Sequence, residues 1–261
     1  MSTTTSVTST SSSPPPDEGS NPMNETYYAG VYWPSRGESP EACALRAEAL
    51  FGQLASLDPT LSPWFEQANS RAAALKSQFV PDEKSFIELF KKKKYQTGPG
   101  EIAFSAWNGE KEASSVVEFS CGPPSAHTVD VCLFRPPTRG AAAERLLSSV
   151  AVARALRAMA VAWNPEFGIA TSHVHRDEVL KLKEAGTFVG WIMYLSHQRG
   201  QVPALPAPVR VEPVENQGTL IVLTPERFTA SNPDHRALAG QVQELLGDAG
   251  LLKPVTERPS R

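Results

Sequence analysis

The order of apolar and polar positions predicts a mixture of strands and helices that starts with one of each. Residues 26–33, TYYAGVYW, are rich in aromatic and β-branched side chains and stop before Pro34, as expected of a strand. Ser39 is a good N-cap residue and Pro40 suits the first helical position, so a helix is predicted from there to about residue 57. Its apolar positions recur at helical spacing: Leu45, Ala49, Leu50, Leu54 and Leu57.

Two more helices and three strands are predicted next. One helix is expected at 61–74, with Trp64 and Phe65 near its start. The other is expected at 82–93, with an apolar face of Phe86, Ile87, Leu89 and Phe90. The strands are expected at 101–109, 114–122 and 127–135. The links NGEKEA and GPPSA are short and the first is a hairpin signal, so these strands should form an antiparallel meander.

The second half of the chain has the same mixed character. The clearest helix pattern covers 140–163, with the stripe Val152, Leu156, Met159 and Trp163 facing inward and Arg145, Arg154 and Arg157 facing solvent. The later elements are a strand at 166–174, a helix at 175–186 ended by Gly186, a strand at 188–197, a hairpin around 216–218 and a helix capped by Asn232. That last helix should turn Leu238, Val242, Leu245 and Leu246 inward.

The stretch GTFVGWIMYLSHQRG, residues 186–200, is apolar on both faces of the strand expected within it. Phe188, Gly190, Ile192 and Tyr194 would point one way, and Val189, Trp191, Met193 and Leu195 the other. A strand of this kind is expected in the middle of a sheet that is covered on both sides. Gly190 has no side chain, so a helix or a ring is expected to approach closely there.

Together these elements predict an α+β fold, mainly antiparallel sheets with helices packed on them. We expect a single domain over 23–252, and the element order also allows two related halves, 25–163 and 164–250. Two segments are expected outside it: 1–22, dominated by Ser, Thr and Pro and predicted to be disordered, and 253–261, predicted to be loose. Because apolar patterning begins abruptly at Met23, the functional chain is expected to start there.

Composition narrows the function classes. The net charge of −3 is not basic enough to predict direct nucleic-acid binding. No apolar run approaches the ~20 residues of a membrane span, and the N-terminus lacks the pattern of a signal peptide. Cys43, Cys121 and Cys132 are odd in number and have no CxxC spacing, so we expect core cysteines without a disulfide and a cytoplasmic protein.

Few residues point to chemistry. His173 and His175 lie two apart with Asp177 and Glu178 next, so they could ligate zinc with His197 or His235, although a polar strand end explains the same pattern. Lys91–Lys94 could touch phosphate but equally complements a helix C-terminus. Glu166 is a lone carboxylate in a turn. No phosphate-binding loop, G-x-S-x-G or H-E-x-x-H motif is present, so neither an enzyme nor a cofactor is predicted.

Several segments carry a family resemblance. TYYAGVYW, WNPEFGIATS, VGWIMYLS, GTLIVLT and FTASNPDH, in this order and spacing, resemble the immunity protein 52 family of bacterial polymorphic-toxin systems. The resemblance covers roughly residues 25–252, and the Ser/Thr/Pro tail departs from the family pattern. It implies a cytoplasmic antitoxin that binds and neutralises a cognate toxin. Such toxins often have a restriction-endonuclease-like fold and include type VI secretion effectors, so the implied partner is a DNase.

The resemblance supplies no binding residues, so the contact is predicted from charge. A nuclease site is cationic or holds metal, and carboxylates on loops would steer and anchor the inhibitor. We expect the hairpin tip with Glu110 and Glu112 and the loop with Glu212 and Glu215 to contact the toxin, with Trp107 as an aromatic anchor. Ordinary solvated loop acids and a core tryptophan are the alternative interpretation.

Two other functions stay open from the residues alone. One is an adaptor or chaperone that loads an effector onto a secretion machine and leaves its activity intact. The other is a metal-dependent hydrolase that uses His173 and His175. The sequence does not predict the oligomeric state, nor whether inhibition plugs the toxin's active site or distorts it.

Overall fold

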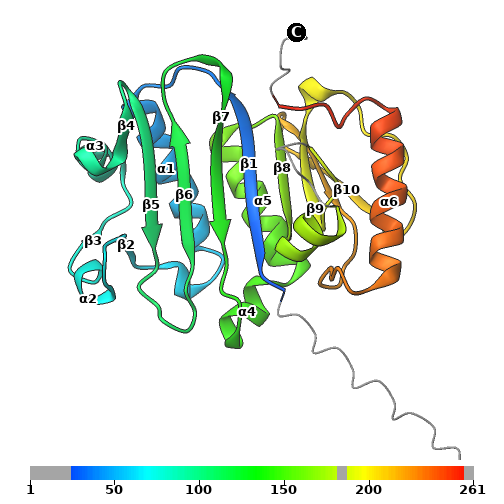
Figure 1. Cartoon of the computed structure of the whole chain (residues 1–261), viewed down its shortest axis with the longest axis horizontal. Coiled ribbons are helices and arrows are strands. Elements are labelled where there is room, and N and C mark those ends of the chain that lie inside the picture. Colours follow the sequence, from blue (N-terminus) through cyan, green and yellow to red (C-terminus); the bar gives the residue numbers. More distant parts are fainter. Residues whose placement is uncertain (1–24, 181–186, 256–261) are drawn as a thin grey trace, which may run out of the picture.

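The computed structural model describes residues 25–180 and 187–255, and these form one antiparallel sheet with helices packed on it (Figure 1). The strands are β1 (Tyr27–Ser35), β2 (Trp64–Glu66), β3 (Gln78–Phe79), β4 (Gln96–Gly98), β5 (Glu101–Trp107), β6 (Val116–Cys121), β7 (Ser125–Arg135), β8 (Phe167–Ser172), β9 (Ile192–Ser196), β10 (Arg210–Val214) and β11 (Gly218–Val222). The helices are α1 (Pro40–Ala55), α2 (Arg71–Ala74), α3 (Glu83–Phe90), α4 (Gly140–Leu146), α5 (Ser149–Trp163) and α6 (Pro233–Asp248). The short turns are η1 (Pro59–Leu61), η2 (Lys93–Tyr95), the π-helical η3 (His175–Val179) and η4 (His197–Arg199).

The sheet follows the order β10-β11-β9-β8-β1-β7-β6-β5-β2-β3, and β4 pairs with β5. Every pairing between described strands is antiparallel. The predicted α+β class and the β5–β6–β7 meander are therefore confirmed. The first strand, β1, lies in the middle of the sheet between β7 and β8, so strands from both parts of the chain meet on either side of it.

Helices α1 and α5 lie on one face of the sheet, behind it in Figure 1. The predicted cap of α1 is confirmed: the Ala42 amide donates to Ser39 Oγ at 3.2 Å. The predicted inward stripe is partly wrong, because Leu45 and Ala49 are exposed. The helix instead turns its small residues inward beside three larger ones: Cys43, Ala44, Ala47, Leu50, Phe51 and Leu54. Small side chains allow a close approach to the sheet, and helical spacing does not reveal that preference.

The helix predicted at 61–74 is wrong. This segment contains η1, the strand β2 with Trp64 and Phe65, and only one helical turn, α2. Pro63 disfavours helical backbone at Ser62 only, and the residues that follow it gain contacts with the sheet instead. The strand β2 in this segment pairs with β5, and Phe65 lies opposite Trp107 in the pairing register.

The helix predicted at 140–163 is broken into α4 and α5, which meet at 70°. Ser148 starts the second helix, because its Oγ accepts a hydrogen bond from the Ala151 amide at 3.3 Å. The predicted inward stripe on α5 is confirmed, since all four of its residues are buried. In the described ranges no single helix is long and apolar enough to cross a membrane, and only the bent α4–α5 pair reaches that combined length and composition.

Residues 188–196 of the apolar stretch are buried, and the strand within it, β9, lies in the middle of the sheet between β8 and β11, covered on both faces. The strand is shorter than predicted, because β9 begins at Ile192 and residues 188–191 before it are not part of the strand. A Cβ at Gly190 would lie 2.9 Å from side-chain atoms of Ile169 and Thr171. The close approach expected at this glycine is thus made by the neighbouring strand β8, and not by a helix or a ring.

The prediction that the cysteines form no disulfide is wrong. Cys43 of α1 and Cys121 of β6 are 78 residues apart in sequence and form a disulfide between the helix and the sheet. Cys132 on β7 is free and fully buried. The expectation that all three would be core residues is confirmed.

Three predictions fall wholly or partly outside the described residues. The tail at 1–22 lies outside them, as do 181–186, which include the predicted cap Gly186, and 256–261. Where the predicted helix 175–186 is described, it is the π-helical turn η3. Near the other end, the Lys253 carbonyl accepts hydrogen bonds from the Thr187 hydroxyl at 3.0 Å and from Arg199 Nη1 at 2.6 Å.

Candidate functional site

The loop between β5 and β6 is held in one shape by the buried side chain of Asn108. Its Nδ2 donates to the carbonyls of Thr60 and Ala113, both at 2.9 Å. Its Oδ1 accepts from the amides of Ser115 at 2.9 Å and Glu110 at 3.4 Å. One amide side chain therefore ties both ends of the loop together and to η1, and the tip is ordered before any partner arrives.

Trp107 stands at the base of this loop and is half-buried, so it is not the fully buried core residue of the alternative interpretation. Its Nε1–H donates to the Ser114 hydroxyl at 3.0 Å. Its ring lies 6.3 Å from that of Phe65 and has the Arg71 guanidinium 6.0 Å from its centre. The ring is thus fixed in place while part of its surface meets solvent, as a preorganised contact residue requires.

Acrylamide quenching is expected to report on Trp107 alone. The other four tryptophans, Trp33, Trp64, Trp163 and Trp191, are at most 1% exposed. We expect the accessible fraction of tryptophan fluorescence to be lost in Trp107→Phe, while the blue-shifted fraction stays unchanged. Stern–Volmer titration of both proteins measures this, and equal quenching in the two would contradict the placement of Trp107.

The two acids at the tip, Glu110 and Glu112, are both exposed. Glu112 lies 3.3 Å from Arg139, but both side chains are about 70% exposed (69% and 72%), so this pair is weak and easily exchanged. No ion pair involves Glu110 among the described residues. A partner can therefore bind both carboxylates of the tip with little loss of existing stabilising contacts.

In the second predicted acidic loop, at the β10–β11 turn, one of the two acids already has an arginine partner. Glu212 lies on the α5 side of the sheet and accepts from Arg157 Nη2 at 3.1 Å, with Arg210 at 3.8 Å. Glu215 is exposed and occupies the left-handed turn position, with φ of 45°. Only Glu215 of this pair is thus presented freely.

The structure does not bring the two acidic loops together. Seven antiparallel pairings lead from β5 to β10 along the sheet, so these strands run in opposite directions. The β5–β6 loop and the β10–β11 turn therefore lie at opposite ends of the strands and toward opposite edges of the sheet. A compact partner surface can meet one of them far more easily than both.

The histidine pair considered for zinc is used for packing. His175 is 1% exposed, its Nε2 lies 3.0 Å from the Val189 carbonyl, and its ring contacts Phe228 at 4.9 Å. His173 stacks on Tyr28 at 4.9 Å, and His235 Nδ1 accepts from the Thr229 amide at 3.0 Å. Over residues 25–180 and 187–255 no group of three or more potential ligands could hold a metal ion.

Stability is expected to fall on acidification because of His175. Burial lowers the pKa of His175 below its usual value, since the charged form would lose its hydration. Below pH ~6.5 the unfolded chain binds more protons at this residue than the folded chain does. The contribution of neutral His175 to the free energy of unfolding is therefore fully present above that pH, and the free energy of unfolding decreases by up to about 1.4 kcal/mol per pH unit below it. Urea denaturation at pH 7.5 and 5.5 should show a smaller pH effect in His175→Gln than in the wild type. The exposed His197→Gln is the control, and an unchanged pH dependence in His175→Gln would refute the assignment.

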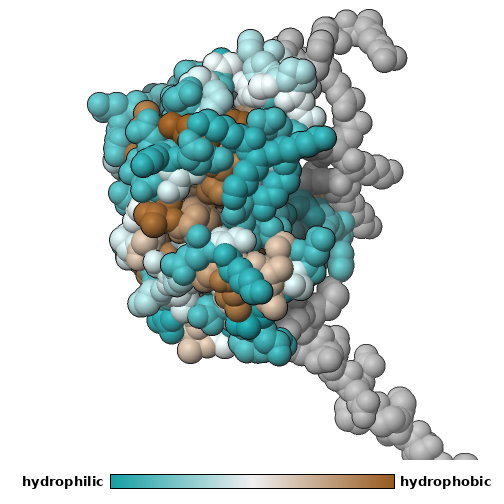
Figure 2. Space-filling view, turned by 90° about the vertical axis from the view of Figure 1, so that its left-hand side faces the viewer, coloured by the Kyte–Doolittle hydropathy of each residue, from teal (hydrophilic) through white to brown (hydrophobic). Residues whose placement is uncertain are grey.

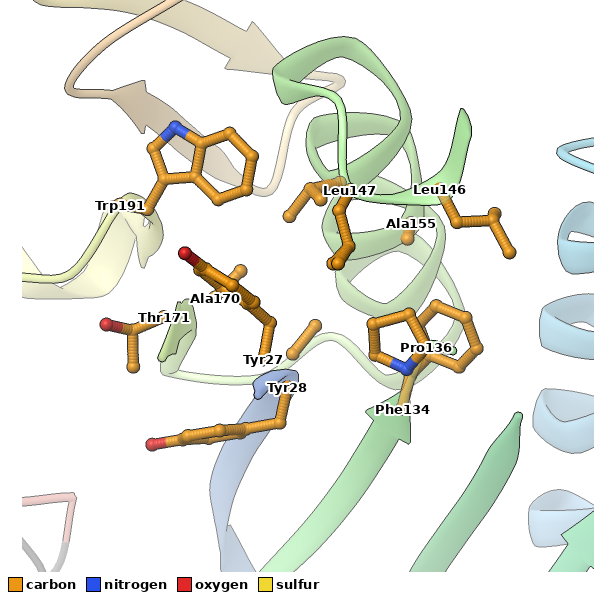
Figure 3. A pocket seen from close by; sticks show the side chains of 12 residues that line it. Tyr27, Tyr28, Phe134, Pro136, Leu146, Leu147, Ala155, Ala170, Thr171 and Trp191 are labelled. Carbon is orange, nitrogen blue, oxygen red and sulfur yellow. The ribbon is translucent and has the colours of Figure 1, made fainter. Parts of the chain in front are cut away.

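One apolar cavity lies where β1, β7 and β8 meet α4 and α5 (Figure 3). It is lined chiefly by aromatic and aliphatic side chains, among them Tyr27, Phe134, Leu147 and Trp191. The polar tips labelled in Figure 3 do not converge on its centre. This arrangement suits a gap in a hydrophobic core better than a ligand site, which needs a few convergent polar groups.

Comparison with known proteins decides the family. The sequence pattern of the immunity protein 52 family matches residues 25–255. The chain belongs to the immunity protein 52 family. Membership confirms the resemblance drawn from the sequence and supports an immunity role for this chain.

A comparison with solved structures finds a protein of similar fold. It is similar to a type VI secretion system protein of Pseudomonas aeruginosa, PA0821, with a TM-score of 0.53 and 14% sequence identity over 88% of this chain and 77% of that one. At that identity the likeness establishes a shared fold. No curated protein sequence matches the chain at a significant level.

The lysine run of this immunity protein has a structural use that its sequence did not predict. Lys92 and Lys94 pair with Glu66 of β2 at 2.6 Å and 3.0 Å, and Tyr95 donates its hydroxyl to the same carboxylate at 2.9 Å. The run therefore does more than complement the end of α3, because it ties that end to the β2 strand. Lys91 and Lys93 are exposed.

Proposed function

We propose that this immunity protein neutralises one cognate bacterial toxin by direct binding in the cytoplasm, and that the toxin is a DNase. The observation that carries the proposal is the family match over residues 25–255, which spans all of the described residues. The nuclease class follows from the toxins commonly paired with this family. Inhibition by binding requires no turnover and no cofactor from this chain.

The β5–β6 loop is the contact we propose for the toxin's cationic surface. Glu110 and Glu112 are exposed on a loop whose backbone Asn108 already fixes, so little conformational entropy is lost on binding. The carboxylates would raise the association rate by attraction to a DNA-binding surface. Glu212 is less suited to this task, because Arg157 already neutralises it.

Co-expression with the toxin encoded beside this gene tests the proposal. Cells that express the toxin should lose DNA integrity and viability, and both should be restored when the full chain is co-expressed. Purified toxin should lose its activity on plasmid DNA at a 1:1 ratio of the two proteins. A chain that binds the toxin but leaves DNA cleavage intact would support an adaptor and refute immunity.

Charge reversal tests the contact. Glu110→Lys/Glu112→Lys is expected to weaken toxin binding by about 10- to 100-fold, which corresponds to roughly 1.4–2.8 kcal/mol, mainly through a slower association rate. Glu244→Lys/Asp248→Lys on α6 makes the same change in net charge at exposed positions elsewhere. Surface plasmon resonance at two salt concentrations separates the cases. Equal losses in both variants would mean that net charge alone, and not this loop, matters.

A further inference from the structure

The two halves of the sheet are covered unequally on the face opposite α5. Beyond β1, the large apolar side chains of β8, β9 and β11 on this face are buried: Phe167, Ile169, Met193, Leu195 and Ile221 are at most 2% exposed. They share one hydrophobic core with Val242 and Leu246 of α6. Over β5, β6 and β7 no described helix covers the same face, and Figure 1 shows these strands in front of α1 with none before them. We call this uncovered region the open face.

The register of the strands fixes which residues form the open face. In rows across β5, β6, β7 and β1 they are Trp107, Val116 and Arg135; then Ser105, Glu118, Leu133 and Gly30; then Ala103, Ser120, Val131 and Tyr32; and finally Val129 with Pro34. These side chains are half-buried or exposed, apart from Gly30. A sheet face meant only for water carries mainly polar residues, whereas most of these are apolar or aromatic.

The centre of the open face is held in place by side-chain contacts. Gly30 lacks a side chain, so the Tyr32 ring folds across it, with the hydroxyl 2.7 Å from where a Cβ would stand and Leu133 Cδ2 2.8 Å from the same point. Beside it, Glu118 is paired with Arg135 and accepts a hydrogen bond from the Ser105 hydroxyl at 3.5 Å. A fixed aromatic ring beside a glutamate–arginine ion pair on a mainly apolar surface has the composition of a binding hot spot.

The area of the open face is about half of what one partner buries in a stable interface. Four strands about 4.8 Å apart, each with about seven residues at ~3.3 Å, give on the order of 400 Å². A standard interface buries about 800 Å² of each partner. The β5–β6 loop adjoins the face directly, because Trp107 belongs to both, and it can supply more of the contact. The surface is thus continuous with the proposed acidic contact.

Strand addition at the sheet edges is disfavoured by contrast. Pro213 in the edge strand β10 has no amide hydrogen, and its carbonyl already accepts from Arg157 Nη1 at 2.7 Å. The other edge strand, β3, has two residues and is followed by Val80 and Pro81. Figure 2 views this edge and shows separate brown patches among teal ones. Near β3 in sequence, Leu75 is 37% exposed and Val80 is 64% exposed. A partner gains few backbone hydrogen bonds at either edge.

We propose that the toxin docks on the open face and supplies the layer that α6 supplies over the other half of the sheet. The docked toxin surface is apolar at its centre, against Val131, Leu133 and Tyr32, and cationic where it meets Glu110 and Glu112. This inference rests on the proposed function, since it names where the neutralised toxin sits.

Arginine substitutions on the open face test the proposal. Ser120→Arg adds bulk and charge at a half-buried polar position without removing a core side chain, and Val129→Arg does so at a position 36% exposed. Val150→Arg, at a position 62% exposed on α5, is the matched control on the other side of the sheet. Circular dichroism and melting temperature establish that each variant is folded. The probe is a catalytically inactive form of the toxin encoded beside this gene, titrated by calorimetry.

The expected result is a Kd at least 10-fold higher for both open-face variants, a Kd within about 3-fold of wild type for Val150→Arg, and loss of acrylamide quenching of Trp107 in the wild-type complex. Wild-type affinity in folded Ser120→Arg and Val129→Arg overturns the docking site but leaves the immunity function intact. A wild-type chain that neither binds nor inhibits the toxin refutes the proposed function itself. A wild-type dimer that Ser120→Arg converts to a monomer would show that a second copy, and not the toxin, covers this face.

Discussion

Replacing Trp191 by aspartate is expected to unfold the protein, with a loss of more than about 5 kcal/mol in the free energy of unfolding. Trp191 is fully buried, and its Nε1–H donates to the Thr224 carbonyl at 3.1 Å. Removing a buried tryptophan side chain costs about 3–5 kcal/mol, and an unpaired buried carboxylate adds several more. Natural domains are stable by about 5–15 kcal/mol, so little or nothing of the folded state should remain.

The measurement is the soluble yield and the far-UV circular dichroism of Trp191→Asp, with Trp191→Phe as the milder comparison. Trp191→Phe keeps an aromatic ring against Tyr27 but leaves the Thr224 carbonyl without its donor, so it should fold with reduced stability. Toxin affinity in Trp191→Phe should be close to wild type, because Trp191 lies in the core and the open face does not include it. A soluble, folded Trp191→Asp that has lost only its toxin affinity would contradict this account.

The elements that the sequence predicts well are those whose signals are local. The cap at Ser39, the cap at Asn232 and the turn between β10 and β11 each depend on a few neighbouring residues, and all three are present. Asn232 Oδ1, for example, accepts from the Asp234 amide at 2.9 Å. Local chemistry decides such features almost independently of the rest of the fold.

Errors arose where tertiary contacts outweigh local pattern. The segment after Pro63 has helix-forming residues in it, yet Trp64 and Phe65 gain more by joining the sheet beside Trp107 than by continuing a helix. The inward face of α1 is set by close packing of Cys43, Ala44 and Ala47, and its disulfide joins residues far apart in sequence. Helical spacing and cysteine counts carry no information about such long-range partners.

The candidate site shows the same division. Loop acids at Glu110 and Glu112 could be found from sequence, because a hairpin signal places them at a tip. That Glu212 pairs with Arg157, and that the two acidic loops lie at opposite ends of the sheet, depends on the strand order. The open face could not be found either, since it exists only because α6 covers one half of the sheet and not the other.

Gly218→Ala and Gly240→Ala are expected to change stability in opposite directions. A Cβ at Gly218 would meet the Leu195 carbonyl oxygen and stand 2.7 Å from the Tyr194 ring. That carbonyl belongs to the neighbouring strand β9, whose backbone cannot move without disturbing its pairing with β11, so a loss of about 2–3 kcal/mol is expected. At Gly240, within α6, nothing lies within 4 Å of the added Cβ, and alanine should stabilise the helix by about 0.5–1 kcal/mol.

Urea denaturation of both variants measures these changes, and binding of the inactive toxin below the unfolding transition connects them to function. Gly218 closes the turn that carries Glu215, at the end of the sheet away from the β5–β6 loop. If the toxin contacts the open face and the β5–β6 loop, Gly218→Ala should bind it with nearly wild-type affinity despite the lower stability. A Gly218→Ala variant that is folded yet binds the toxin at least 10-fold more weakly would place the interface at the β10–β11 turn instead, because that turn is the part of the surface the substitution disturbs.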